Sequence, residues 1–481
     1  MSEIMTFSQC LSRLMQRYQL TATSLASLVG GRAELKRILM DDSTDSKRIH
    51  LFEKLKKSDL FQPEDYRQLE LSLEISRIGL DHYKFKQSLE NILNGCPVPP
   101  FQPLMTDQGV LFEDRLSEMK SAEKIDIICI NSCFHSVIAA LLPLFSDEAR
   151  DVHMQHLIHA DAFANTASSF VSVTSPLLFD TRYQPYGMEI SDDVDVYALG
   201  GNLIAIRAEN GTTSKEYFFI VMNDTLVCEM PNADEGQLYT FISKAVSLLS
   251  HKPFLMKESH SSQMDFTSIC MNYLSHELNR ATYSLSNDLS FQQTPTDIAI
   301  ACLRDKGMFS QDDLALLIER TLSIHEQRYQ NQYSKRKYTY RIMTFLGCQR
   351  FLETGLCSDH FVGFRAFTPT ERKRIFGEIL EQAGVNEFFV PLLIKDRHFQ
   401  YRYNLVCYDK LCVSLDMTDT DYDLNKGYRS VFLTFPAFTQ QYMDYYLKTL
   451  AKEKCHTRQE SLQILQDMYD AFLKKYDLLP L

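Results

Sequence analysis

Tryptophan is absent from this chain, and so is any apolar run of the ~18 to 20 residues that a membrane-spanning helix needs. The best apolar stretch, Val137–Phe145, is too short and contains Pro143. The N-terminal residues MSEIMTFSQC lack the basic segment and the apolar stretch of a secretory signal. The missing tryptophan excludes no activity, but the other two absences predict a soluble, cytoplasmic protein with no membrane partner.

Several signatures of chemistry are also missing. The chain contains no GxxxxGK[ST] phosphate loop, no GxGxxG dinucleotide fingerprint and no GxSxG nucleophile elbow. Its 12 cysteines stand singly in apolar segments without a CxxC pair, and the nearest pairs are Cys129/Cys133 and Cys407/Cys412. Buried free thiols in a reducing compartment explain this distribution better than disulfides or a zinc site. With no catalytic motif in sight, we predict neither a cofactor nor an enzymatic activity.

Histidines cluster at one place, in VHMQHLIHAD. His153, His156 and His159 are spaced by three residues. On a helix such positions drift around the axis, and on a strand His156 points opposite to the other two. Three metal ligands therefore do not converge in either conformation. HEL at His276–Leu278 lacks the second histidine of a zinc-binding helix, so the sequence predicts no metal site.

Charge is unevenly distributed along the chain. The net charge is −12, which disfavours nucleic-acid binding by the surface as a whole. Residues 1–60 nevertheless hold ten Lys and Arg against seven acidic residues, a local charge of +3 that leaves −15 for the rest. A small basic region on an acidic body fits a local contact with a polyanion.

The 481 residues exceed one ordinary core and suggest about three domains. After a helical N-terminal region, the isoleucine-rich run Lys124–Ile130 predicts a buried strand, and further strands are expected at VHMQHLI, VDVYAL, NLIAIRA and EYFFIVM. We predict a multidomain α + α/β fold. Its segments are a helix-turn-helix domain (1–60), a helical connector and linker (61–123), a first α/β lobe (124–250), a helical segment (251–358), and a second α/β lobe with a C-terminal helix (359–481).

The last third of the chain resembles the first α/β lobe. NEFFVPLLIKD matches DVHMQHLIHAD, KLCVSLD matches NLIAIRA, RSVFLTFPA matches EYFFIVMND, and QQYMDYYLKTLA matches LYTFISKAVSLL in apolar pattern. Identities are few, so the pattern leaves open whether the two lobes are duplicates. Two related lobes joined by helices are a common way to build a cleft for a small ligand.

The stretch Thr21–Met40 predicts two short helices around a glycine turn. Ala26 is small enough for the helices to cross closely, and Gly30 allows the positive φ of the turn. The pattern resembles the helix-turn-helix of the Cro/C1-type (XRE-like) bacterial DNA-binding family, on Leu25, Ala26, Val29, Gly30, Leu35, Arg37 and Ile38. Gly30 to Leu35 spans five positions where that family has six, and Gly31 stands where the family has an apolar residue.

The resemblance implies a bacterial transcriptional regulator that binds double-stranded DNA as a homodimer. The large C-terminal region would then sense a small-molecule or protein effector. The residues expected to face DNA are Thr21, Thr23, Arg32, Glu34, Lys36 and Arg37.

Two other classes of function stay open. One is a catalytic protein that processes nucleotides or phosphate esters, because duplicated α/β halves build the phospholipase-D-like phosphodiesterases. HADAF at His159 and KDRHF at Lys395 do not supply the HxK(x)4D motif of those enzymes. The other class is a protein-interaction scaffold whose N-terminal helices dock a partner. A cleft that holds strongly shifted titratable groups would favour the enzyme.

Two basic runs with aromatic neighbours bear on this alternative. SKRKYTYR at Ser334–Arg341 and ERKR at Glu371–Arg374 suit contacts with phosphate groups. On amphipathic helices such runs usually form solvated faces, and we expect the same for both runs.

Overall fold

A computed structural model of the chain separates into two compact units, Met1–Gln87 and Ser88–Leu481. The residues that the structure describes are 5–94, 103–130, 135–147, 150–159, 171, 174, 177–188, 202–223, 225–230, 237–249, 252–253, 255–258, 275–287, 289, 294–304, 310–356, 365–401, 403–417, 430–434 and 436–477. Helix α6 (Leu80–Asn94) contains the boundary between the two units.

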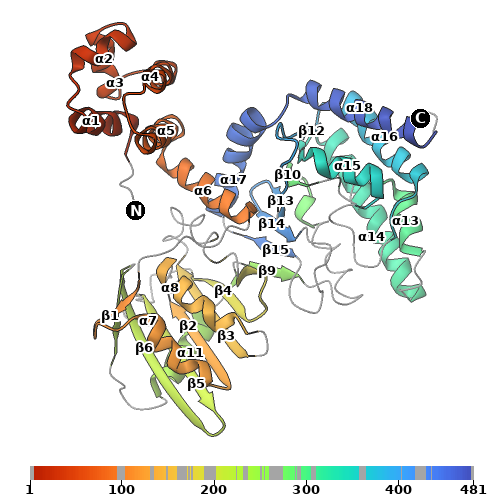
Figure 1. Cartoon of the computed structure of the whole chain (residues 1–481). Helices are drawn as coiled ribbons and strands as arrows, with labels where there is room; N and C mark the ends of the chain where they lie inside the picture. Colours follow the sequence, from red (N-terminus) through yellow and green to blue (C-terminus); the bar gives the residue numbers. More distant parts are fainter. Residues whose placement is uncertain are drawn as a thin grey trace. The chain divides into compact units, whose positions relative to one another are not determined.

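The N-terminal unit is a bundle of helices (Figure 1). The helices are α1 (Phe7–Arg17), α2 (Ala22–Val29), α3 (Arg32–Leu39), α4 (Asp45–Ser58) and α5 (Pro63–Ile78). The side chains of Thr6 and Thr21 cap α1 and α2, and Gly30 ends α2 in the left-handed conformation with φ 87°. Apolar residues at helical spacing form one core, which includes Phe7, Leu11, Leu14, Leu25, Leu35, Ile38, Leu51 and Leu55.

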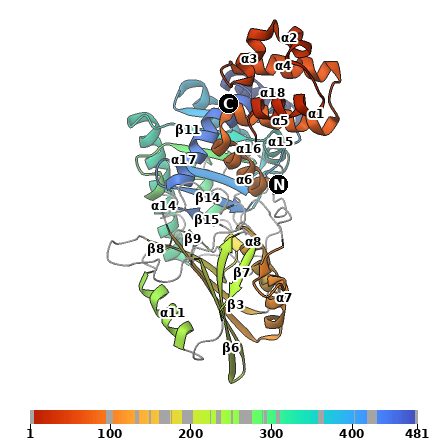
Figure 2. The same cartoon turned by 90° about the vertical axis from the view of Figure 1, so that its left-hand side faces the viewer.

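The first sheet, sheet A, has the strand order β1-β7-β6-β5-β2-β3-β4-β8. The strands are β1 (Met105–Thr106), β2 (Lys124–Ile130), β3 (Asp151–His159), β4 (Tyr183–Met188), β5 (Leu203–Asn210), β6 (Thr213–Asn223), β7 (Leu226–Glu229) and β8 (Lys252–Pro253). Helix α11 (Gln237–Leu249) and helix α7 (Phe112–Ser117) lie on opposite faces of the sheet (Figure 2). This lobe also contains helix α8 (His135–Leu141) and two 3-10 helices, η1 (Glu118–Ser121) and η2 (Leu142–Phe145).

The second sheet, sheet B, has the order β12-β11-β10-β13-β14-β15-β9. Its strands are β9 (Leu255–Glu258), β10 (Thr282–Ser286), β11 (Thr339–Met343), β12 (Phe389–Leu393), β13 (Tyr403–Tyr408), β14 (Cys412–Met417) and β15 (Ser430–Leu433). The helices are α13 (Thr296–Arg304), α14 (Gln311–Tyr329), α15 (Phe345–Thr354), α16 (Pro369–Val385), α17 (Pro436–Tyr445) and α18 (Arg458–Lys475). Two π-helices, η5 (Gln330–Ser334) and η6 (Tyr446–Lys454), directly follow α14 and α17.

Helices cover both faces of sheet B. On one face, Met343, Phe389 and Leu393 belong to an apolar core with residues of α15, α16 and α18. On the other face, the fully buried Tyr446 donates a hydrogen bond of 2.9 Å to the main-chain oxygen of Ser284. The sheet is therefore held by packing from two sides.

Six strands of each sheet share one topology, so the two α/β lobes repeat a common plan. In sheet A, β2, β3 and β4 are parallel to one another, and β5, β6 and β7 follow β2 as antiparallel strands. In sheet B, β10, β11 and β12 are parallel, and β13, β14 and β15 follow β10 in the same antiparallel arrangement. The strand orders β4-β3-β2-β5-β6-β7 and β12-β11-β10-β13-β14-β15 correspond one to one.

The strand pairing proposed from the sequence is shifted by one strand. NEFFVPLLIKD forms β12 and corresponds to β4, whereas the sequence pattern matched it to β3. KLCVSLD and RSVFLTFPA form β14 and β15, which correspond to β6 and β7 and not to β5 and β6. The shift arises because β10 and β11 were not recognised as strands. The helix matching, α17 with α11, agrees with the topology, since each helix follows the last of the six shared strands, β15 or β7.

The predicted fold class, a multidomain α + α/β fold, is confirmed. Two segments differ from expectation. Within the expected linker 61–123, β1 pairs with β7 and α7 packs into the first lobe, because Phe112 and Leu116 are buried. The expected helical segment 251–358 contains β8, β9, β10 and β11 besides its helices. The expected strand VDVYAL lies outside the described residues.

No helix in the described ranges is both long and apolar enough to cross a membrane.

Candidate functional site

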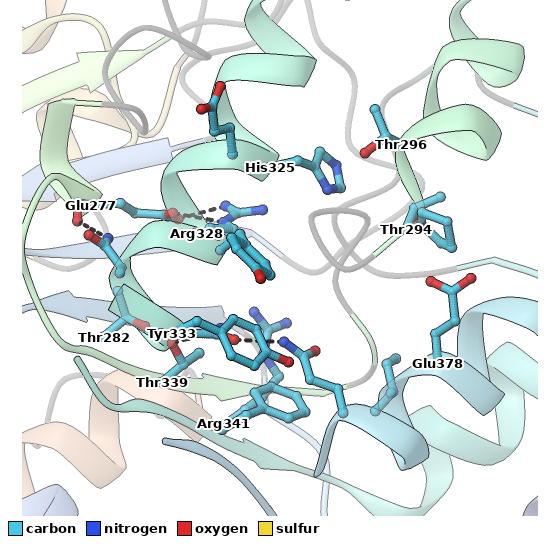
Figure 3. A pocket seen from close by; sticks show the side chains of 18 of the residues that line it. Glu277, Thr282, Thr294, Thr296, His325, Arg328, Tyr333, Thr339, Arg341 and Glu378 are labelled. Atoms are coloured by element: carbon cyan, nitrogen blue, oxygen red, sulfur yellow. Dashed lines mark hydrogen bonds and ion pairs between the residues drawn. The ribbon is translucent and has the colours of Figure 1, made fainter. Parts of the chain in front are cut away.

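A polar cavity of about 1040 Å³ lies on one face of sheet B. Strands β10 and β11 and helices α13, α14 and α16 contribute its lining (Figure 3). The lining mixes both signs of charge. The charged residues are Arg280, Arg328, Arg341 and Arg374 together with Glu277, Asp297, Glu326, Glu378 and Glu381.

Two neighbouring parallel strands form the floor. Thr282 pairs with Thr339, and Ser284 pairs with Arg341, so these four side chains share one face of the sheet. Arg341 is only 7% exposed and Ser284 only 3%. The floor thus places a buried guanidinium beside three hydroxyl groups.

Helix α14 forms one wall of the cavity. Its residue Arg328 makes a largely buried ion pair with Glu277. Arg328 donates to both carboxylate oxygens of Glu277, Nε to Oε2 at 2.7 Å and Nη2 to Oε1 at 2.6 Å. The side chain of Glu277 is 7% exposed and that of Arg328 is 19% exposed. Asn331 donates from Nδ2 to the main-chain oxygen of Glu277 at 2.6 Å. These bonds tie the end of α14 to the segment that precedes β10.

The end of α14 and the π-helix η5 together supply two buried amides, Asn331 and Gln332, and two exposed tyrosines, Tyr329 and Tyr333. Gln332 donates from Nε2 to the hydroxyl of Thr339 at 3.2 Å and accepts from Nε2 of Gln382 at 2.6 Å. Because Thr339 accepts this bond, the proton of its hydroxyl is free to be donated to a ligand. Tyr329 and Tyr333 line the same cavity and are 59% and 43% exposed. Their ring centroids are 4.6 Å apart.

His325 projects from α14 into the cavity on the side of Thr294 and Thr296 (Figure 3). Burial, with the nearby positive charge of Arg328, lowers the pKa of His325 to about 4. The imidazole is therefore neutral at pH 7 and can accept a proton. His325 is therefore a titratable group with a strongly lowered pKa inside a cavity, a feature that favours an enzyme.

The opposite rim carries carboxylates held by Arg374. The Arg374 guanidinium pairs with Asp297 through Nη1, and Nε donates to Oε1 of Glu378 at 2.7 Å. Hydrogen bonding from Arg374 lowers the pKa of Asp297. Glu326 and Glu381 are exposed on the same lining. The cavity therefore has a cationic floor at Arg341. The exposed carboxylates of Glu326 and Glu381 form what we call its acidic rim.

The first lobe carries a different group at the corresponding place. His156 pairs with Pro185 of β4, as Arg341 pairs with Pro391 of β12, so His156 and Arg341 occupy matching positions of the two lobes. His156 is fully buried, its Nδ1 lies 3.1 Å from the Tyr183 hydroxyl, and burial lowers its pKa to about 3. The first lobe thus holds a neutral, closed pair where the second lobe holds a cation facing a cavity.

The residues expected to contact DNA lie in the N-terminal unit, on α2 and α3 and just before α2. Thr21 is the N-cap of α2, and Thr23 accepts a hydrogen bond of 2.7 Å from Nη2 of Arg32. Glu34 pairs with Lys47 at 2.7 Å, and Lys36 and Arg37 are exposed. The structure brings Thr23 and Arg32 together, and it ties Arg32 and Glu34 to neighbouring side chains of their own unit.

Sequence reasoning missed the cavity residues although it touched several of them. Both basic runs end in a cavity arginine, Arg341 and Arg374, and HEL contributes Glu277. The expectation of two solvated helix faces is wrong for Arg341, because that residue lies on strand β11 and is buried. One signal was available. In Thr339–Met343, polar and apolar residues alternate as in a half-buried strand.

The histidine cluster has the strand conformation, with His153, His156 and His159 all on β3. His153 pairs with Asp151 at 2.8 Å, whereas His156 points into the core. Within the part of the chain that the structure describes, no three His, Cys, Asp or Glu side chains are grouped to hold a metal ion.

No protein-family model and no curated protein sequence matches the chain. Among solved structures, the phosphatidylserine synthase of Haemophilus influenzae Rd KW20 is 9% identical, with a TM-score of 0.24 over 82% of this chain and 98% of that chain.

The prediction of a DNA-binding transcriptional regulator is withdrawn, because no family model and no curated sequence supports it. The structure agrees with this correction. Arg32 and Glu34 already bond to side chains of the N-terminal unit, and the polar cavity lies on sheet B. With a TM-score of 0.24, the likeness assigns neither substrate nor mechanism. Those have to come from the geometry of the cavity.

Proposed function

We propose that the cavity on sheet B binds a phosphate ester and that the protein hydrolyses this ester. The observation that carries the proposal is the Arg341 guanidinium, 7% exposed on the cavity floor beside the hydroxyls of Thr282, Ser284 and Thr339. A guanidinium fork binds two phosphate oxygens at once, and the hydroxyls of Thr282 and Thr339 add donors, whereas Ser284 Oγ donates to the main-chain oxygen of Tyr340 at 3.3 Å. In a buried site such charge-assisted hydrogen bonds are stronger than in water.

His325 supplies the proton acceptor. Since burial lowers its pKa to about 4, the imidazole is neutral at neutral pH, and the negative charge of a bound phosphate raises that pKa toward the working range. In hydrolysis, His325 takes the proton of the attacking water as its oxygen bonds to phosphorus. The ester P–O bond breaks, and the leaving alkoxide takes the proton back from the imidazolium. Such proton transfer contributes roughly 10²- to 10⁴-fold to a rate.

The test uses the full-length protein with p-nitrophenyl phosphate and bis(p-nitrophenyl) phosphate, following binding by calorimetry and cleavage by nitrophenolate release. Arg341→Met is expected to weaken binding by about 10- to 150-fold, the loss of a charge-assisted hydrogen-bond set. His325→Gln is expected to lower kcat by roughly 10²- to 10⁴-fold with little change in KM. Arg350→Met on α15, outside the cavity lining, is the matched control.

Two results would overturn the proposal. One is a wild-type protein that neither binds nor cleaves the two esters at millimolar concentration. The other is an Arg341→Met variant that binds and cleaves them as the Arg350→Met control does. If binding is lost in Arg341→Met but no variant alters cleavage, the site binds phosphate and the hydrolytic step is rejected.

We also propose that the protein works in a reducing compartment such as the cytoplasm. Cys10, Cys228, Cys407 and Cys455 are free thiols in the structure. Free thiols of this kind are typical of reducing compartments. Thiol titration of the protein from its native source under denaturing conditions tests the proposal, which fails if these four cysteines are found oxidised.

A further inference from the structure

Tyr329 and Tyr333 are exposed aromatic side chains that line the cavity. They lie at the junction of α14 and the π-helix η5, where the widened turn buries Asn331 and Gln332 and leaves both rings on the cavity side. The rings are 59% and 43% exposed and tilted by 31° at 4.6 Å. Exposed aromatic faces that line a cavity favour a flat ligand.

The acidic rim adds a second requirement. Glu326 and Glu381 are exposed on the cavity lining, and ionised carboxylates only accept hydrogen bonds. A ligand that carries only negative charge gains at Arg341 but is repelled by this rim. A ligand with a phosphate at one end and neutral N–H donors at the other satisfies both regions.

The volume sets the size of the ligand. At about 1040 Å³ the cavity is far larger than a phosphate group needs and matches the sites of drug-sized ligands. The floor, the tyrosine pair and the rim thus describe one molecule of three parts: an anionic group, a linker, and a flat ring bearing amino groups.

We infer that the ester bound in this cavity is a nucleotide with an amino-bearing base. Its phosphate lies on Arg341, its base stacks on Tyr333, and Glu326 or Glu381 accepts from the amino group of the base. The inference rests on the proposed phosphate-ester site and names the class of ester that the site takes. Stacking on an aromatic side chain tolerates different bases, so adenine and cytosine nucleotides both fit.

The experiment measures equilibrium binding of AMP, CMP, ribose 5-phosphate and phosphoethanolamine to the full-length protein by calorimetry. AMP and CMP are expected to bind at least ten-fold more tightly than ribose 5-phosphate. Tyr333→Leu is expected to weaken AMP binding by about 5- to 150-fold and to leave ribose 5-phosphate unchanged. Tyr333→Phe keeps the ring and is expected to stay within about three-fold of the wild type. Tyr338→Leu, an exposed tyrosine outside the cavity lining, is the matched control.

The outcomes separate the two proposals. If ribose 5-phosphate and AMP bind equally well, and both are lost in Arg341→Met, the nucleotide inference fails while the phosphate-ester site stands. If phosphoethanolamine binds more tightly than AMP, the acidic rim recognises an ammonium group and the inference is likewise rejected. If none of the four compounds binds, the phosphate-ester site itself fails.

Discussion

Two histidines of the second lobe, the buried His276 and the partly buried His325, make the stability of this lobe depend on pH. His276 is 8% exposed and packs against Tyr408 and Phe432, with ring centroids 5.5 and 4.9 Å away. Burial, with the charge of Arg280, lowers its pKa to about 4, and burial lowers the pKa of His325 to about 4 as well. Both imidazoles are therefore neutral in the folded protein well below the pH at which an exposed histidine is protonated.

The direction follows from proton uptake. An unfolded histidine has a pKa of about 6.5, so between pH 6.5 and 4 the unfolded chain binds protons that the folded lobe excludes. Stability is complete above pH 6.5 and is lost as the pH falls toward 4. At pH 5 each histidine costs about 2 kcal/mol, since one pKa unit corresponds to about 1.4 kcal/mol. The pair together costs about 4 kcal/mol.

Urea unfolding at pH 7 and pH 5, followed by circular dichroism, measures this loss. Maleimide labelling of the buried Cys407 at pH 7 identifies the transition that belongs to the second lobe. His325→Gln and His276→Leu are each expected to reduce the loss between pH 7 and pH 5 by about 2 kcal/mol. His398→Gln, at an exposed position, is expected to leave the loss unchanged. The reasoning is refuted if the His325 and His276 variants both lose as much stability as the wild type.

Two further predictions concern the packing of the same lobe. Gly355 ends α15 with φ 74°, and a Cβ there would collide with the backbone of Phe367, so Gly355→Ala is expected to lower the melting temperature by several degrees. Gly384→Ala, on α16 with open space around it, is expected to raise the melting temperature slightly, and equal effects of the two variants would contradict the prediction. Tyr446→Phe leaves the buried main-chain oxygen of Ser284 without its 2.9 Å hydrogen bond, which is expected to cost about 1 kcal/mol in urea unfolding. Unchanged stability would show that this hydrogen bond contributes nothing.

The parts of the fold that were predictable are those whose own residues determine their conformation. Lys124–Ile130 forms β2 as expected, because its continuous apolar part, 127–130, suits a strand buried on both faces. Thr368 begins α16 with a capping box to Glu371, and its apolar residues recur at helical spacing, so this helix was also readable. In each case, local preference and burial favour the same conformation.

Strands β10 and β11 were missed because each carries polar residues that line the cavity. Each has one apolar face on Tyr446 and one polar face toward the cavity, so neither reads as a buried run. In Thr339–Met343 the alternation was visible, but the following residues of α15 continue an apolar pattern that masks the boundary at Thr344. The sequence thus resembles one helix, although the Thr344 side chain accepts from the amide of Gly347 and begins a new element.

The burial of Arg341 is a tertiary property that no local pattern contains. Its own run, SKRKYTYR, has the composition of a solvated surface, and only the placement of α14 and η5 over sheet B encloses the last residue of that run. The same holds for His325, whose pKa is lowered by burial and by Arg328 one helical turn away, itself held by Glu277 from a distant part of the chain. A cavity whose lining extends along the chain from Glu277 to Val406 is therefore found from geometry. Its chemistry is then read from the residue types that the geometry brings together.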